Sequence, residues 1–227
     1  MYPLMENKIN EHDNEGFLQY LVKSIVVIAF ILMPVAAGIA ILDKEVVTII
    51  FARNEFGATA VNLTSLAILG YVISIPFTGI RDILNSSLFA MEKTKTTAFN
   101  GIIGVAINIV LNIYLSKRLG IIGIALSSSI SSVVIAILLF RSTVKYTGQL
   151  DVKPLLIKLF KILLSTAIMF IILIIFNSLT GISGILKILV DGIIGASIYV
   201  VFAIILKIEE LNEVLTMIKS KVVKGEG

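Results

Sequence analysis

Six apolar stretches, each long enough to cross a lipid bilayer, constrain this chain of 227 residues more than any other feature. In chain order they cover about Ser24–Leu42, Ala60–Ile80, Ala98–Leu115, Ile121–Phe140, Leu155–Phe176 and Ile185–Leu206. About 20 helical residues, rising 1.5 Å each, cross a bilayer core about 30 Å thick. Because 57% of the residues are hydrophobic, a water-soluble fold would have too few polar side chains to cover such helices. The sequence predicts an all-α, polytopic transmembrane helical bundle with six spans.

Positive charges are distributed unevenly between the segments that flank these stretches. If the N-terminus lies inside the cell, the inner segments hold thirteen cations, which are Lys8, Lys23, Lys93, Lys95, Arg141, Lys145, Lys153, Lys158, Lys161, Lys207, Lys219, Lys221 and Lys224. The outer loops then hold five, which are Lys44, Arg53, Lys117, Arg118 and Lys187. Since loops rich in lysine and arginine stay in the cytoplasm, we expect both termini there. Contact with an anionic inner leaflet accounts for the net charge of +4 without a nucleic-acid partner.

Side chains that bind metals or act as nucleophiles are scarce. The chain has no cysteine, which excludes disulfides and thiolate metal sites. Its one histidine, His12, stands in a polar run and has no second imidazole to complete a metal or catalytic site. The ionisable groups within the apolar stretches are too scattered to pair a nucleophile with a base. We therefore expect no enzymatic activity, no cofactor and no metal.

The third stretch carries a polar stripe. Asn100, Gly104, Asn108 and Asn112 recur every four residues, which places them on one slowly rotating face of a helix. Amides that faced lipid would lack hydrogen-bond partners, so this face should contact protein or a wet cavity. The fourth stretch is rich in glycine and serine, which allow helix backbones to approach closely. Two interpretations of the stripe stay open, close packing and the lining of a cavity.

The second stretch continues beyond Ile80 into a polar segment that contains Arg81, Asp82 and Asn85. No proline or glycine ends it, so the sequence predicts one helix from about Ala60 to Met91, with a kink at Pro76. Arg81 lies about 30 Å from the start of that helix. It is either an anchor at the inner membrane boundary or a cation that lines a cavity.

Loops and charges divide the chain into four segments. Residues 1–23 form a cytoplasmic N-terminal segment, residues 24–140 hold four transmembrane helices, residues 141–206 hold a loop and two further helices, and residues 207–227 form an amphipathic cytoplasmic tail. Near the outer end of the last helix, Lys187 and Asp191 stand four residues apart. An ion pair between them would lower the cost of burying either charge.

Several runs of residues resemble MurJ-type lipid II flippases, within the multidrug, oligosaccharidyl-lipid and polysaccharide exporter superfamily. They are Asn54–Gly57, Thr64 with Leu69–Tyr71, Phe89–Thr96, Asn108 with Asn112, and Leu119–Leu126. The resemblance spans most of the chain and is clearest between Met33 and Ser132. The family fold has fourteen helices, namely two six-helix lobes around a central cavity and a final pair that forms a hydrophobic groove. The chain then corresponds to helices nine to fourteen, which make a partial MATE-like fold.

The resemblance also implies a function and a set of site residues. The expected function is the C-terminal part of a flippase that moves lipid II, an undecaprenyl-linked peptidoglycan precursor, from the inner to the outer leaflet of the bacterial cytoplasmic membrane by alternating access. Expected partners are that lipid-linked substrate, membrane lipids and the missing N-terminal helices, from the same chain or from another. The substrate-cavity candidates are Arg81, Asp82, Asn85, Asn108 and Asn112, and the lipid-groove candidates are Phe170, Phe176 and Tyr199. The essential cavity arginines of the family lie in its first, second and eighth helices, so none is carried over to this chain.

Two other functions stay open at this point. A related exporter of another polyprenyl-linked glycan or of drugs would share the fold, and only substrate competition separates it from a lipid II flippase. A membrane scaffold without transport activity would need no polar stripe. Replacing Asn108 and Asn112 by leucine would then leave cellular function intact.

Overall fold

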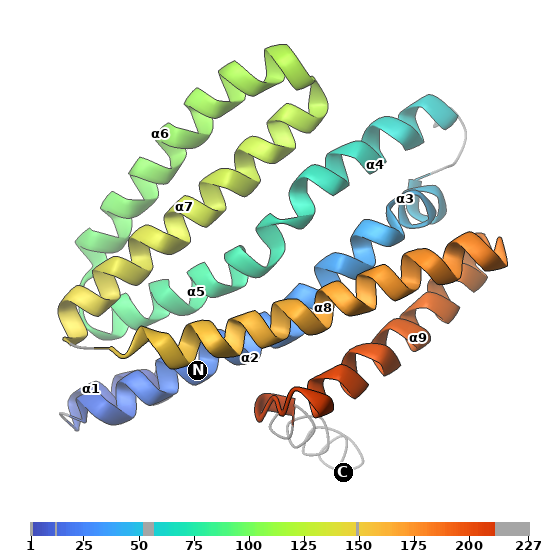
Figure 1. Cartoon of the computed structure of the whole chain (residues 1–227). Helices are drawn as coiled ribbons and strands as arrows, with labels where there is room; N and C mark the ends of the chain where they lie inside the picture. The colour runs from blue at the N-terminus through green and yellow to red at the C-terminus, as the bar shows by residue number, and fades with distance from the viewer. Residues whose placement is uncertain (1, 12, 52–56, 149, 212–227) are drawn as a thin grey trace, which may run out of the picture.

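The computed structural model describes residues 2–11, 13–51, 57–148 and 150–211, and these residues fold into a bundle of helices (Figure 1). In chain order the helices are α1 (Tyr2–Asn10), α2 (Asn14–Ile41), α3 (Asp43–Phe51), α4 (Ala58–Val72), α5 (Ser74–Ala90), α6 (Thr94–Leu119), α7 (Ile121–Thr147), α8 (Val152–Thr180) and α9 (Gly184–Ile205). Five of them are long and apolar enough to cross a bilayer, and α4 with α5 makes a sixth crossing when the bent pair is taken as one span. The all-α transmembrane fold is confirmed.

The predicted unbroken helix from Ala60 to Met91 is wrong in one respect. The segment is helical from Ala58 to Ala90 except at Ile73, which separates α4 from α5 at a bend of 42°. Pro76 explains the position of the break, because proline lacks the N–H that would bond to the carbonyl four residues earlier, at Val72. The predicted kink is therefore large enough to divide the span into two helices.

Helix α2 is the central element of the bundle. It packs against α5 on one side and against α8 on another, and its buried side chains include Phe17, Leu21 and Ile25. The core continues into α5 through Leu84 and into α8 through Ile162. Helix α7 packs against α4, α5 and α6, whereas α9 packs against α8, α3 and α2. The α6–α7 hairpin and the α8–α9 pair thus flank the centre of the bundle on different sides (Figure 1).

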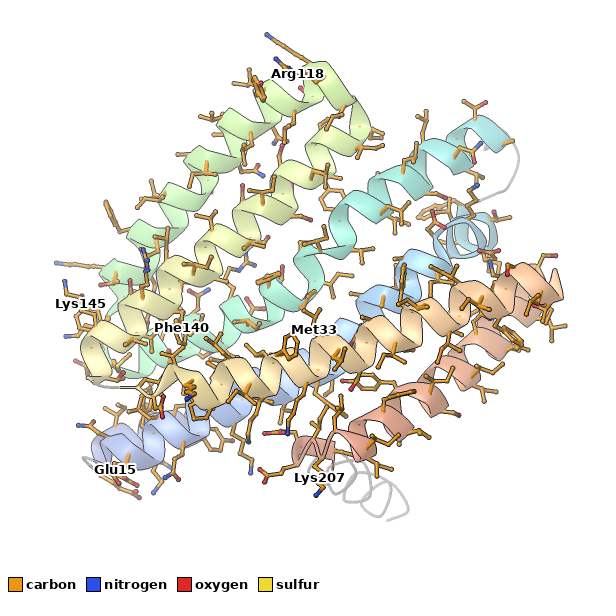
Figure 2. The ribbon with its side chains drawn as sticks, in the orientation of Figure 1. Glu15, Met33, Arg118, Phe140, Lys145 and Lys207 are labelled. Carbon is orange, nitrogen blue, oxygen red and sulfur yellow. The ribbon has the colours of Figure 1, made fainter. Side chains whose placement is uncertain are left out.

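Short turns place charged residues at both ends of the bundle. Gly120, with a φ of 59°, forms the turn between α6 and α7, a backbone conformation that glycine adopts without a steric penalty. Arg118 lies beside this turn at one end, while Glu15, Lys145 and Lys207 lie at the other end (Figure 2). The same end holds Lys93 and Lys95, between α5 and the first turn of α6.

The observed helices revise the predicted segment boundaries. Helix α2 begins at Asn14, inside the predicted N-terminal segment 1–23, and Asp13 caps it by accepting a hydrogen bond from the backbone N–H of Gly16 at 2.8 Å. Helix α7 continues to Thr147, so only residues 148–151 separate it from α8. Most of the predicted tail 207–227, the loop histidine at position 12 and part of the run from Asn54 lie outside the described residues.

Candidate functional site

The candidates Arg81, Asp82 and Asn85 lie on one polar arc of α5. The buried face of this helix includes Ile83 and Leu84, and Arg81 borders that face with a side chain 32% exposed. Positions 81 and 85 are one helical turn apart, so the guanidinium and the amide lie above one another. The arginine Nε is 3.7 Å from Oδ1 of Asp82, whose side chain is 67% exposed. The three candidates therefore lie on one surface of α5, which carries the positive charge of Arg81 and the negative charge of Asp82.

Amide groups connect α6 to α7. Nδ2 of Asn100 donates to the hydroxyl of Ser142 at 2.9 Å, and Nδ2 of Asn108 donates to Ser128 at 3.4 Å. One turn further along α6, Nδ2 of Asn112 donates to Oδ1 of Asn108 at 3.0 Å. These contacts favour the packing interpretation of the stripe. One polar atom of the stripe remains unpaired, since Oδ1 of Asn112 is buried without a hydrogen-bond partner in the described part of the chain.

Small residues bring α7 close to its neighbours. The hydroxyl of Ser129 donates to the backbone carbonyl of Gly70 on α4 at 2.6 Å, and a Cβ added at Gly70 would come within 2.5 Å of Ala125. A Cβ added at Gly123 would meet the backbone carbonyl of Leu115 on α6. Such close approach explains the glycine and serine content of the fourth stretch. Helix α7 is thereby held by both α4 and α6.

The cavity candidates form two groups rather than one. Helix α7 packs extensively against both α5 and α6, while α5 and α6 contact each other much less (Figure 1). Between α5 and α7, Ser87 and Thr143 are hydrogen-bonded at 3.3 Å in a buried position. Asn108 and Asn112 face α7, whereas Arg81, Asp82 and Asn85 lie on the polar arc of α5. Sequence spacing alone did not reveal this division, because it depends on which helices pack together.

A half-open pocket lies between α2, α8 and α9, in the region where the lipid groove was predicted. Its volume is about 290 Å³, and its lining includes Val35, Met169, Leu173, Tyr199 and Val200. Tyr199 is one of the three groove candidates. Phe170 lines a neighbouring pocket of about 270 Å³, and Phe176 is half-buried on α8 outside both linings. The walls of the main pocket are almost entirely apolar, which suits an aliphatic ligand.

Tyr199 compensates for a missing backbone hydrogen bond in α2. Pro34 lacks an N–H, so the carbonyl of Phe30 loses its partner within the helix. The hydroxyl of Tyr199 donates to that carbonyl at 2.8 Å, in a buried position. The rings of Phe30 and Tyr199 also contact, with centroids 5.0 Å apart. The groove candidate is therefore also a structural connection between α9 and α2.

The predicted ion pair between Lys187 and Asp191 is wrong. Lys187 binds Glu45 of α3 at 2.7 Å, and these two side chains are only 15% and 16% exposed. Asp191 is 2% exposed and accepts a hydrogen bond from Nδ2 of Asn177 on α8 at 2.8 Å. Sequence analysis missed both Glu45 and Asn177 as partners, because the pairing depends on how α9 lies against α3 and α8. Asp191 is also one of the residues that line the pocket between α2, α8 and α9.

Comparison with known proteins gives consistent results. Residues 1–194 match the family model described as lipid II flippase MurJ. The chain is 29% identical to the probable lipid II flippase MurJ of Thermotoga maritima over 213 residues, which are 93% of this chain and 41% of that protein. It is 26% identical to the lipid II flippase MurJ of Thermosipho africanus over 123 residues, 54% of this chain and 26% of that one. The chain thus spans less than half the length of the curated relatives it matches.

A solved structure has the same fold. A lipid II flippase MurJ in an inward closed conformation superimposes with a TM-score of 0.76 and 24% identity, covering 90% of this chain and 42% of that one. The family model covers most of the chain, and the chain has five to six helical spans that are long and apolar enough to cross a membrane. The chain is a multi-pass membrane protein that belongs to the MurJ lipid II flippase family, a family of transporters rather than enzymes.

Proposed function

We propose that this chain forms the C-terminal part of a flippase that moves lipid II from the inner to the outer leaflet by alternating access. The match of residues 1–194 to the flippase family carries this proposal. Because the matched relatives are more than twice as long as the chain, the remaining helices would come from another segment or another chain. The described helices would then supply one wall of the substrate cavity and the groove beside it.

The polar arc of α5 supports a cavity wall. An arginine, an aspartate and an asparagine would not be stable against hydrocarbon, where an uncompensated charge costs about 2.5 to 3.5 kcal/mol or more. Arg81 lies nine residues before the end of α5 at Ala90, which is about 14 Å along the helix axis. The arc must therefore face water or other helices. A cavity between this chain and the missing helices satisfies both conditions, and it would place Arg81 where a pyrophosphate could bind.

The groove between α2, α8 and α9 supports a site for the polyprenyl tail. Its apolar lining matches an aliphatic chain in chemistry, and its half-open shape admits a ligand longer than the pocket itself. Phe170 and Tyr199 would contact the tail. Phe176, near the end of α8, would contact it only where the tail leaves the pocket.

Complementation tests the flippase directly. In cells depleted of their own lipid II flippase, this chain alone should not restore growth, whereas the chain together with the missing N-terminal helices should. Within that complete protein, Arg81→Gln should lose activity, and Arg81→Lys should lose part of it because lysine lacks the planar fork that binds a pyrophosphate through two hydrogen bonds. Arg141→Gln is a matched control, since Arg141 is an exposed arginine at the end of α7. Full activity of both Arg81 variants would remove Arg81 from the cavity.

The proposed orientation places the end of the bundle that holds the N-terminus in the cytoplasm. Cysteine labelling can test it cleanly because the chain has no cysteine of its own. Lys44 and Lys95 are both exposed lysines and lie at opposite ends of the bundle. An impermeant maleimide added outside intact cells should label Lys44→Cys and not Lys95→Cys. The reverse result would overturn the orientation and leave the fold unchanged.

A further inference from the structure

The contact between Asp191 and Asn177 is incomplete in a specific way. Asn177 donates through Nδ2 to Oδ2 of Asp191 at 2.8 Å. The other oxygen of each side chain, Oδ1 of Asp191 and Oδ1 of Asn177, is buried without a hydrogen-bond partner in the described part of the chain. Asp191 as a whole is only 2% exposed. Two buried acceptors therefore lack donors, although their side chains already touch.

One proton on the carboxyl group of Asp191 would pair both of these oxygens. An ionised carboxylate and an amide oxygen can only accept, so neither can satisfy the other. We propose that Asp191 is a proton-binding site, and that its protonated Oδ1 donates to Oδ1 of Asn177. The carboxylic acid and the primary amide would then exchange two hydrogen bonds in one ring. This arrangement leaves no buried acceptor unpaired, whereas an ionised Asp191 would keep a charge in an apolar groove with a single donor.

The charges around Asp191 do not offer an alternative partner. On α9 itself the nearest cation is Lys187, one turn away, and Glu45 of α3 already binds it at 2.7 Å. Helix α3 also carries Asp43, which is half-buried, and Lys44, which is exposed. Neither makes an ion pair with α9 among the described residues. The charged residues of α2 and α8, which include Lys23 and Lys158, lie at the opposite end of these helices.

The proton site adjoins the groove. Asp191 borders the pocket together with Gly192 and Gly195, two glycines on the same helix. Both unpaired oxygens are buried although the pocket is half-open, so water in the pocket does not supply their missing donors. An apolar ligand in the pocket would then lie beside a neutral carboxylic acid rather than beside a charge. This holds whether or not that ligand is the tail of lipid II.

Infrared spectroscopy of the chain in lipid vesicles tests the proton itself. At neutral pH the spectrum should contain the carbonyl band of a protonated carboxylic acid, which shifts in D₂O. The band should be absent in Asp191→Asn and unchanged in Asp151→Asn, whose exposed carboxylate caps the start of α8. Asn177→Leu should keep the band but raise its frequency, because a hydrogen bond to the carbonyl is lost. Absence of any band that depends on Asp191 would overturn the proposal.

Two further measurements separate a bound proton at Asp191 from a bound metal cation. Exchange of potassium for sodium at fixed pH should leave the band unchanged, and its suppression by sodium would assign the site to a metal cation instead. In thermal unfolding, the midpoint of the wild type should fall as the pH rises toward the value at which the band is lost, because the proton that the folded state holds is then given up. Asp191→Asn should lack this part of the fall, because an amide pair forms the same two bonds at every pH, while the other ionisable groups keep their contributions. The same fall over that pH range in Asp191→Asn would contradict the assignment, and neither readout depends on transport.

Discussion

The α6–α7 hairpin and the α8–α9 pair are held together by different kinds of contact. In the hairpin, glycine and serine bring backbones together, and several neutral hydrogen bonds such as that between Asn100 and Ser142 are spread along its length. In the α8–α9 pair the contact is largely apolar, and Asn177 of α8 donates a hydrogen bond to the buried Asp191 of α9. Beside this pair, Lys187 of α9 forms a partly buried ion pair with Glu45 of α3. The first arrangement depends on shape and the second on a few ionisable groups.

This difference bears on what each region can do. Contacts that rely on close backbone approach tolerate little change in helix spacing, so the hairpin is suited to be a fixed wall. The groove beside α8 and α9 has a half-open pocket and a carboxylate whose protonation would alter its polarity. The two regions therefore differ in the kind of contact that a substitution would disturb.

The largest effect should come from adding one methyl group to the hairpin. In Gly123→Ala the new Cβ would collide with the backbone carbonyl of Leu115, which cannot rotate away. We expect a loss of about 3 kcal/mol in unfolding free energy, measured by circular dichroism in detergent. In the matched variant Gly195→Ala of α9 the new Cβ would meet only side chains, the flexible end of Leu173 at 3.0 Å and the sulfur of Met169 at 3.7 Å, and the substitution should cost much less. Equal costs would remove the contrast between the two regions.

A smaller effect should follow from breaking the ion pair of the α8–α9 region. Lys187→Met leaves Glu45 partly buried without a partner, which should cost about 2 kcal/mol of stability. The double variant Glu45→Gln with Lys187→Met should recover most of that loss, because no charge is left unpaired. Lys44→Met, at an exposed position on α3, should be neutral. A neutral Lys187→Met would show that charges matter no more here than in the hairpin.

Sequence analysis predicted the six spans because long apolar stretches follow directly from the thickness of the bilayer. It missed the break at Ile73, since the angle by which one proline bends a helix depends on how the surrounding helices pack against it. It also missed α3, a nine-residue helix too short to be recognised among the apolar stretches. Polar residues in the last turns of α7 look like a loop in the sequence, although the helix continues to Thr147.

The predicted site residues show the same limit. The four-residue spacing of Asn100, Asn108 and Asn112 correctly predicted one helix face that contacts protein. It could not show which helix the face would meet. The pairing of Lys187 with Asp191 was chosen by local spacing, whereas Glu45 is 142 residues away along the chain. Partners that lie on different helices are fixed by packing, which a single sequence does not display.

The buried hydroxyl of Tyr199 should contribute about 1 kcal/mol. Tyr199→Phe keeps the ring contact with Phe30 but removes the hydroxyl that donates to the backbone carbonyl of Phe30. That carbonyl is then left without a donor, because Pro34 has no N–H to bond it within the helix. Thermal unfolding should show this loss, whereas Tyr146→Phe should not, because the bond between Tyr146 and Thr96 is exposed to water. An unchanged Tyr199→Phe would mean that water replaces the hydroxyl and that the groove is wetter than its apolar lining suggests.

The smallest effect on stability should come from the amides of α6, and it gives the sharpest functional test. Hydrogen bonds between membrane helices contribute about 0.6 kcal/mol each, so the single replacements Asn108→Leu and Asn112→Leu should each change the unfolding free energy by only about that much. If the stripe only packs, transport by the complete protein should survive. If the side chains of Asn108 and Asn112 also line the cavity, transport should be lost at unchanged membrane levels. Replacing Asn100 by leucine is the control, since this residue bonds Ser142 near the other end of α6. Loss of transport in all three variants alike would point to packing damage, and loss confined to the pair at 108 and 112 would mark the hairpin as a wall of the cavity.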